Sequence, residues 1–347
     1  LIFTYYDDHR ATISTMKITL LPLMGAFHLR YPNYNAIHVR DLVADSKPDA
    51  VLTTAIEQDF LNRPEWQDTP ELALPLAVVP WTSRQRIPFH AVPVASPDPT
   101  ATQDFRKYIS SFPNLNARLM EIDTTLRTLK ELLETSLTLE RIQKEVLPLF
   151  SKHQDSLKKE FGDGPSTGWI GERSNLAAER ILTLDAERVT VLSSAEHLPA
   201  LDAAIGDRAE KIYLLKTNSN DEARERSFLD FAMQVDVPEP GNVIHKLRDL
   251  RVPEARYHEA NILFANGHLI EALELLETVS HGDFSQPYFL PGYLLARLGQ
   301  LRDLTNNRKG AERAYRGVLA LDFAPIEARE ASKKGLSVAF SLSEPAN

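Results

Sequence analysis

The chain contains no cysteine among its 347 residues. Disulfide bonds, thiolate metal ligands and a cysteine nucleophile are therefore excluded, and a bound metal would need His, Asp or Glu ligands. An absence of cysteine is typical of proteins that work in a reducing compartment. We therefore expect a cytoplasmic protein.

Long apolar runs are also missing. The most apolar stretch, residues 72–79, is interrupted by Pro75 and is far shorter than the roughly 20 residues that a membrane helix needs. Residues 1–15 mix Tyr, Asp, His and Arg and lack the apolar core of a signal peptide. We expect no membrane span and no secretion, and we interpret residues 1–15 as an N-terminal extension that precedes Met16.

Positive charge is in deficit, with 39 Lys and Arg against 48 Asp and Glu and a formal net charge of -9. Non-specific nucleic-acid binding needs clustered Lys and Arg, so we expect no nucleic-acid partner. The sequence contains no GxxxxGK[S/T] loop, no GxGxxG after a strand and no GxSxG elbow. These absences disfavour phosphate-loop, dinucleotide-binding and serine-hydrolase functions.

The first two thirds of the chain alternate between strand and helix patterns. Apolar runs at 17–24 and 50–56 flank a helical pattern near 37–43, which predicts a βαβ unit. We expect an α/β domain over residues 16–237, with a mixed sheet, flanking helices and a helical-hairpin insertion at about 102–161. Further strands are predicted at 74–79, 87–92, 189–193 and 211–215.

The last third is predicted to be wholly helical. Two prolines and a glycine at 238–241 break regular structure and predict a domain boundary. Within residues 241–340, four positions recur after 39 residues: Ala260, Gly267, Ala272 and Leu276 return as Gly299, Asn306, Ala311 and Tyr315. This recurrence resembles tetratricopeptide repeats, whose usual period is about 34 residues. We expect an all-α repeat domain that docks on the first domain and binds a protein or peptide partner.

Five polar residues are candidates for a site. His28, in Gly25-x-x-His28, follows the first strand, Glu57 follows the second, and His197 follows the strand at 189–193. Glu172 and Arg173 open a helix after a glycine-rich loop. Carboxyl ends of parallel strands meet at the edge where α/β proteins keep their sites, so we expect these side chains to converge. A lone histidine after a strand is, however, more often a core or loop residue.

These residues, in this order, resemble the motifs of the TraB/TIKI (GumN/PrgY-like) family, within the wider erythromycin-esterase/ChaN-like group. The resemblance covers about residues 17–216. It implies that His28 and His197 bind a divalent metal ion such as manganese, cobalt or zinc, with Glu57, Glu172 and Arg173 as catalytic residues. The chain departs from the pattern at Ser194, where the second GxxH motif has glycine, and at Ser174, where an acidic or amide residue often follows the Glu-Arg pair.

Three functions follow from this resemblance. The first is a metal-dependent hydrolase of peptide, ester or amide bonds, in which Glu57 or Glu172 helps to deprotonate a bound water and Arg173 stabilises the developing negative charge. The second is a non-catalytic interaction or regulatory protein with a degenerate TraB/TIKI-like domain, which Ser194 favours. The third is a protein that binds haem or another small ligand. The oligomeric state stays open.

Overall fold

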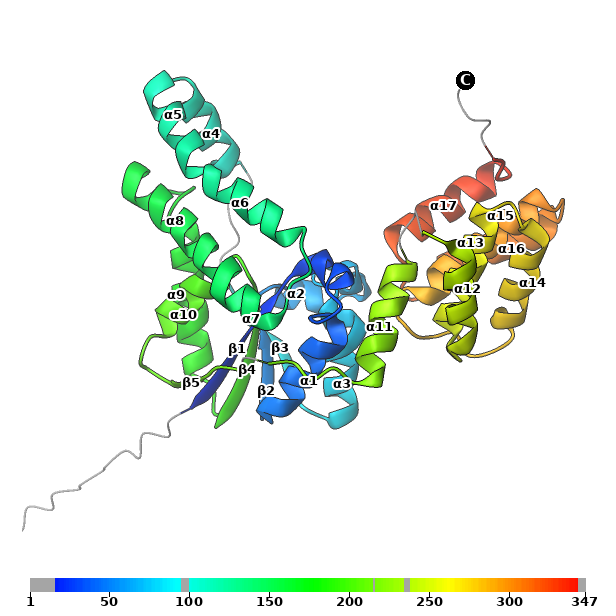
Figure 1. The fold of residues 1–347 in the computed structure, drawn as a ribbon, viewed down its shortest axis with the longest axis horizontal. Coiled ribbons are helices and arrows are strands. Elements are labelled where there is room, and N and C mark those ends of the chain that lie inside the picture. The colour runs from blue at the N-terminus through cyan, green and yellow to red at the C-terminus, as the bar shows by residue number, and fades with distance from the viewer. Residues whose placement is uncertain (1–15, 95–99, 215, 234–237, 343–347) are drawn as a thin grey trace, which may run out of the picture.

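The computed structural model describes residues 16–94, 100–214, 216–233 and 238–342. The predicted N-terminal extension, residues 1–15, lies outside these described residues. An α/β domain and a helical tail lie side by side, and helix α11 (Asp221–Ala232) runs between them (Figure 1). Within the described ranges, no helix combines the length and the apolar composition needed to cross a membrane.

One sheet forms the centre of the α/β domain. Its strands are β1 (Lys17–Leu23), β2 (Ala50–Thr53), β3 (Phe89–Ala91), β4 (Arg188–Ser194) and β5 (Glu210–Ile212), in the order β3-β2-β4-β1-β5. All strand pairs in the described part of the chain are parallel. The prediction of a mixed sheet was therefore wrong. Helical crossovers connect the strands, and such crossovers join parallel neighbours.

The segment predicted as a strand at 74–79 is helical instead. It forms η3 (Leu74–Val78) and the start of α3 (Val79–Gln85). Pro75 lies in the first turn of η3, where its missing N–H removes no helical hydrogen bond, and Pro80 lies where η3 continues into α3. The apolar side chains of η3 pack against helix α1 (Ala36–Ser46). Short apolar runs of this kind do not distinguish a buried helix from a buried strand.

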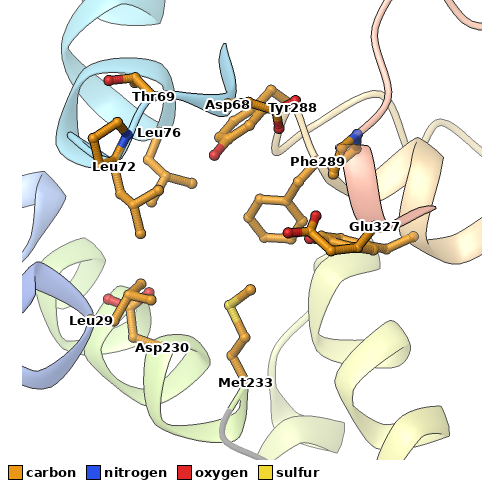
Figure 2. Close-up of a pocket in the computed structure, with 13 residues that line it drawn as sticks. Leu29, Asp68, Thr69, Leu72, Leu76, Asp230, Met233, Tyr288, Phe289 and Glu327 are labelled. Atoms are coloured by element: carbon orange, nitrogen blue, oxygen red, sulfur yellow. The ribbon is translucent and has the colours of Figure 1, made fainter. Parts of the chain in front are cut away.

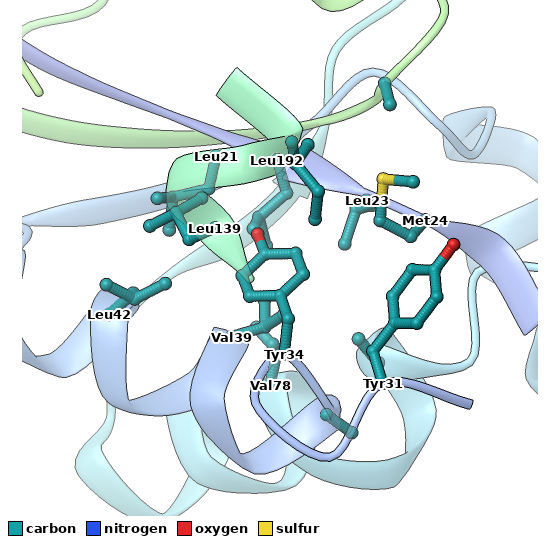
Figure 3. Packing of buried hydrophobic residues seen from close by; sticks show 14 of the residues in the cluster. Leu21, Leu23, Met24, Tyr31, Tyr34, Val39, Leu42, Val78, Leu139 and Leu192 are labelled. Atoms are coloured by element: carbon teal, nitrogen blue, oxygen red, sulfur yellow. The ribbon is translucent and has the colours of Figure 1, made fainter. Parts of the chain in front are cut away.

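Helices cover both faces of the sheet. In β1, Leu21 and Leu23 point to one core cluster and Ile18 and Leu20 to the other, which is the alternation expected of a strand. The first face is covered by α1, η3 and the short helices α7 (Leu139–Arg141) and η4 (Ile142–Val146) (Figure 3). The second face is covered by α9 (Trp169–Leu182) and α10 (Leu198–Ile205).

The expected insertion at 102–161 is helical. It contains α4 (Ala101–Ser110), α5 (Pro113–Ile122), α6 (Thr124–Leu133), α7, η4 and α8 (Leu147–Phe161). The α5 and α6 helices pack against α8, and together they project away from the sheet (Figure 1). The insertion is thus a layer of several helices and not a single hairpin.

The described part of the tail consists of helices that pack in sequence order. These are α12 (Pro240–Asp249), α13 (Pro253–Ala265), α14 (Leu269–Ser280), α15 (Leu290–Leu304), α16 (Arg308–Ala320) and α17 (Ile326–Ser337). Gly267, after α13, has φ 82° and Asn306, after α15, has φ 61°. Glycine and asparagine are the residues that adopt this left-handed conformation most readily. The 39-residue recurrence therefore coincides with two similar helix–turn–helix units.

Helix α11 connects the tail to the α/β domain. On one side, Asn35 Nδ2 donates to the carbonyl of Ala223 and to Ser227 Oγ, both at 2.8 Å. On the other side, Arg226 donates to both carboxylate oxygens of Glu254 in α13, at 2.9 and 2.7 Å. Leu76 of the α/β domain also packs against the core of the tail. The expected docking of the tail on the first domain is thus confirmed.

The buried carboxyl group of Asp230 gives a prediction about pH. Burial, opposed by Arg226, raises its pKa from 3.8 to about 7. A raised pKa stabilises the fold below pH 3.8, and this contribution is lost as the pH rises through 7. We expect the free energy of unfolding of the wild type to fall by about 1–3 kcal/mol between pH 5 and 8, relative to Asp230→Asn. Urea unfolding at the two pH values measures this difference. An equal change in the free energy of unfolding of the wild type and of Asp230→Asn would contradict the prediction.

Candidate functional site

The predicted site residues leave the sheet at the carboxyl ends of β1, β2 and β4, which are neighbouring strands. Gly25 follows β1 with φ 58°, a conformation that suits glycine, and begins η1 (Gly25–Arg30). Glu57 follows β2 and directly precedes α2 (Gln58–Leu61). His197 follows β4 and directly precedes α10. The topology therefore carries these residues to one edge, as the sequence predicted.

His28 is buried in the loop that follows β1. Its Nδ1 donates to the carbonyl oxygen of Tyr34 at 2.8 Å, and its Nε2 accepts from the backbone N–H of Met24 at 3.0 Å. Burial lowers the pKa of His28 to about 4, although the bond to Tyr34 opposes this change. The imidazole is therefore neutral at pH 7, and both of its nitrogens hold the backbone of the loop. A metal ion would have to displace one of these two bonds.

His197 has a different environment. Its ring lies edge-on to Trp169, with 5.3 Å between the ring centroids. Its Nδ1 is buried and has no hydrogen-bond partner within the described residues. Burial and the positive charge of Arg173 lower the pKa of His197 to about 4. His197 thus presents a neutral imidazole whose Nδ1 is not engaged by the described part of the chain.

Arg173 lies between this histidine and the end of β2. It is buried on α9, and its Nη2 donates to the carbonyl oxygen of Thr54 at 2.6 Å. Burial lowers the pKa of Arg173, and the negative charge of Glu57 opposes that effect. The charge of Arg173 therefore acts on both Glu57 and His197. The structure brings these three predicted residues together at the carboxyl edge.

The other two predicted residues lie apart from this group. Glu172 is exposed in the first turn of α9, whereas Arg173 is buried, since adjacent helical residues point about 100° apart. His28 contacts Tyr34, which belongs to the core on the face opposite α9. The described residues include no group of three or more His, Asp or Glu that could hold a metal ion. The donors at this edge therefore do not fit the divalent metal that the resemblance implies, and the metal site stays a prediction.

Sequence reasoning missed one residue of the edge, Glu71. It is 6% exposed, and its Oε1 accepts from Ser194 Oγ at 2.5 Å while its Oε2 accepts from the N–H of Gly25 at 2.9 Å. Burial raises its pKa, and these two hydrogen bonds oppose the increase. Glu71 thus ties the end of β1 to the end of β4. The only signal in the sequence was its position just before the segment that was misassigned as a strand.

Ser194 is the residue that stands where the family pattern has glycine. Its hydroxyl makes the bond to Glu71, so the departure has a defined structural role.

We found no match to this chain among protein-family models, curated proteins or solved structures. The TraB/TIKI and tetratricopeptide resemblances therefore stay predictions from the sequence motifs.

Proposed function

We propose that this chain is a non-catalytic protein-interaction protein, in which a TraB/TIKI-like α/β domain supports a tetratricopeptide-like tail. The hydrogen bonding of His28 carries the proposal. In a metallohydrolase of this pattern His28 would be a ligand, but both of its ring nitrogens bind backbone groups of its own loop. The imidazole serves to fix the chain after β1.

The contacts of Glu71 also support a scaffold. Its two carboxylate oxygens accept from Ser194 and Gly25, so the carboxylate is engaged by groups that join the strand ends. Glycine at position 194 would leave one of these oxygens without its donor. A buried acceptor without a donor costs about 1–3 kcal/mol, so Ser194 and Glu71 form a stabilising pair.

The tail supports the interaction function. Its two helix–turn–helix units recur after 39 residues and place small residues where helices meet. A side chain at Gly299 of α15 would overlap the ring of Tyr315 in α16, so the glycine lets the two helices approach closely. Arrays of helical hairpins offer extended surfaces that bind peptides and proteins. The tail is therefore the proposed site of partner binding.

Metal titration tests the choice between a scaffold and a metallohydrolase. Calorimetry on the full chain with manganese, cobalt and zinc is expected to give no tight stoichiometric binding, because both ring nitrogens of the other predicted ligand, His28, already bind backbone groups. His197→Ala should match the wild type, as should His90→Ala, which removes an exposed histidine from the neighbouring strand β3. Tight binding that is lost in His197→Ala and kept in His90→Ala would contradict the proposal.

The metal-dependent hydrolase is the second candidate. The convergence of Glu57, Arg173 and His197 at the carboxyl edge favours it, because this edge is where α/β enzymes keep their catalytic groups. A positioned acid or base typically contributes about 10²–10⁴-fold to a rate. Hydrolysis of a peptide, ester or amide that falls by about 10²-fold in a folded His197→Ala variant would establish this candidate. A visible absorption band after haem addition would instead support ligand binding.

A further inference from the structure

A cavity of ≈ 250 Å³ lies where the α/β domain, α11 and the tail meet (Figure 2). Leu72 and Leu76 of the α/β domain form one apolar wall, Met233 at the end of α11 forms another, and Phe289 faces them from the tail. The cavity therefore exists only when the tail is docked. Pockets for drug-sized ligands measure about 300–1,000 Å³, so this one suits a smaller group, comparable to one amino-acid side chain.

Aromatic rings and carboxylates line the tail side of this cavity. Tyr288 and Tyr293 flank Phe289 near the start of α15, and Tyr293 donates its hydroxyl to Glu327 Oε2 at 3.0 Å. Asp68, which ends η2 (Pro64–Asp68), lies close to Tyr288 in Figure 2. None of the described lining residues is Lys, Arg or His. The cavity thus combines π faces with acidic groups, and no cation belongs to its described lining.

The negative charge of the cavity comes from both halves of the chain. Asp68 belongs to the α/β domain and Glu327 to α17. Burial and the charge of Glu327 raise the pKa of Asp68, while the N–H of Ile326 and the charge of Arg329 oppose this increase. A third carboxylate, Asp230, already accepts from Arg226 Nε at 2.8 Å. Asp68 and Glu327 are therefore the two acids available to a ligand.

We propose that this cavity binds the side chain of a Lys or Arg residue from a protein partner. The alkyl stem of such a side chain packs well against leucine and methionine, while its charged end stays near polar groups. Tyrosine and phenylalanine rings attract a cation over their faces, and carboxylates make charge-assisted hydrogen bonds to it. A chain with a net charge of -9 also attracts basic partners over a distance. The proposal rests on the interaction function proposed above and identifies the chemistry of the partner.

Peptide selection on the full chain tests the proposal. Linear peptides selected from a random library are expected to contain a Lys or Arg whose replacement by Gln weakens binding by about tenfold, measured by fluorescence anisotropy. In the double variant Asp68→Asn, Glu327→Gln, the same replacement should change the affinity by less than about twofold. Asn and Gln can still accept from the N–H of Ile326 and from the hydroxyl of Tyr293, so docking of the tail is preserved. Glu330→Gln, an exposed change on the same helix outside the cavity, should behave like the wild type.

The outcomes separate the cavity from the general function. Peptides that bind without a basic residue, or that lose as much affinity in the double variant as in the wild type, would overturn the cavity assignment and leave the interaction function standing. Failure to select any peptide, with spermidine binding to the wild type and not to the double variant, would show that the cavity takes a free amine. That result would overturn the partner side chain and would count against the interaction function. If neither peptides nor spermidine bind, both proposals fail.

Discussion

Replacing Arg226 by Ala is expected to lower the free energy of unfolding by about 3–5 kcal/mol. Its guanidinium binds Glu254 through two nitrogens and Asp230 through a third, and the three side chains are 9%, 5% and 2% exposed. Removing the guanidinium takes away the donors of two buried carboxyl groups; Asp230 would then take up a proton, and Glu254 would keep only its contact with His258 at 3.4 Å. A buried charge that loses its partner costs far more than an exposed ion pair contributes.

A matched control lies on the same helix. Arg224 pairs with Asp221 on the exposed side of α11, and Arg224→Ala is expected to cost at most about 1 kcal/mol. Urea unfolding of both variants and the wild type at pH 7 gives the comparison. An equal decrease in the free energy of unfolding for Arg226→Ala and Arg224→Ala would show that the cluster of Arg226, Asp230 and Glu254 does not hold the two halves of the chain together.

The Arg226 cluster also affects the proposed binding cavity. Asp230 accepts from Arg226 and lines the cavity, and Met233 follows one turn later on the same helix. Without Arg226, which lowers the pKa of Asp230, the buried carboxyl group would be mainly protonated, would lack its donor and would draw water into the apolar wall. Arg226→Ala should therefore disturb peptide binding even where the protein is still folded. Stability and binding are coupled because α11 carries both the buried ion pairs of Arg226 and a residue that lines the cavity, Asp230.

The strand ends at the sheet edge could be predicted from the sequence. The apolar runs of β1, β2 and β4 and the turn at Gly25 are local signals, and parallel topology then places Glu57 and His197 at one edge. The helical character of the tail followed from the break at 238–241. Each of these features depends on residues close in sequence.

The chemistry of the edge could not be predicted in the same way. Whether His28 is a ligand or a structural residue depends on where the Tyr34 carbonyl and the Met24 N–H lie relative to its ring. The partner of Ser194 is Glu71, which is 123 residues away in the chain. No local pattern encodes a contact of this kind. The same limitation applies to Leu74–Val78, whose helical form is determined by packing against α1.

The second large expected effect concerns Tyr315 in the tail. Tyr315→Ala should lower the free energy of unfolding by about 3–5 kcal/mol, because its fully buried ring fills the space between Gly299 of α15 and Gly335 of α17. A side chain at either glycine would overlap this ring. Tyr315→Phe keeps the ring and loses only the hydrogen bond from the hydroxyl to Asp303, so we expect the free energy of unfolding to fall by about 1 kcal/mol. Thermal or urea unfolding measures the stability of both variants. Equal destabilisation of Tyr315→Ala and Tyr315→Phe would contradict the role assigned to the ring.

Tyr315 also links the stability of the tail to the binding proposal. Its ring holds α15 against α17, and these two helices carry Tyr293 and Glu327 to the cavity. Tyr315→Ala should therefore weaken the binding of the selected basic peptides at temperatures where the protein is still folded, whereas Tyr315→Phe should not. If Tyr315→Ala destabilises the protein and leaves peptide binding unchanged, the basic side chain must bind elsewhere than between these helices. The residue that packs the tail and the residues that bind the partner would then be independent.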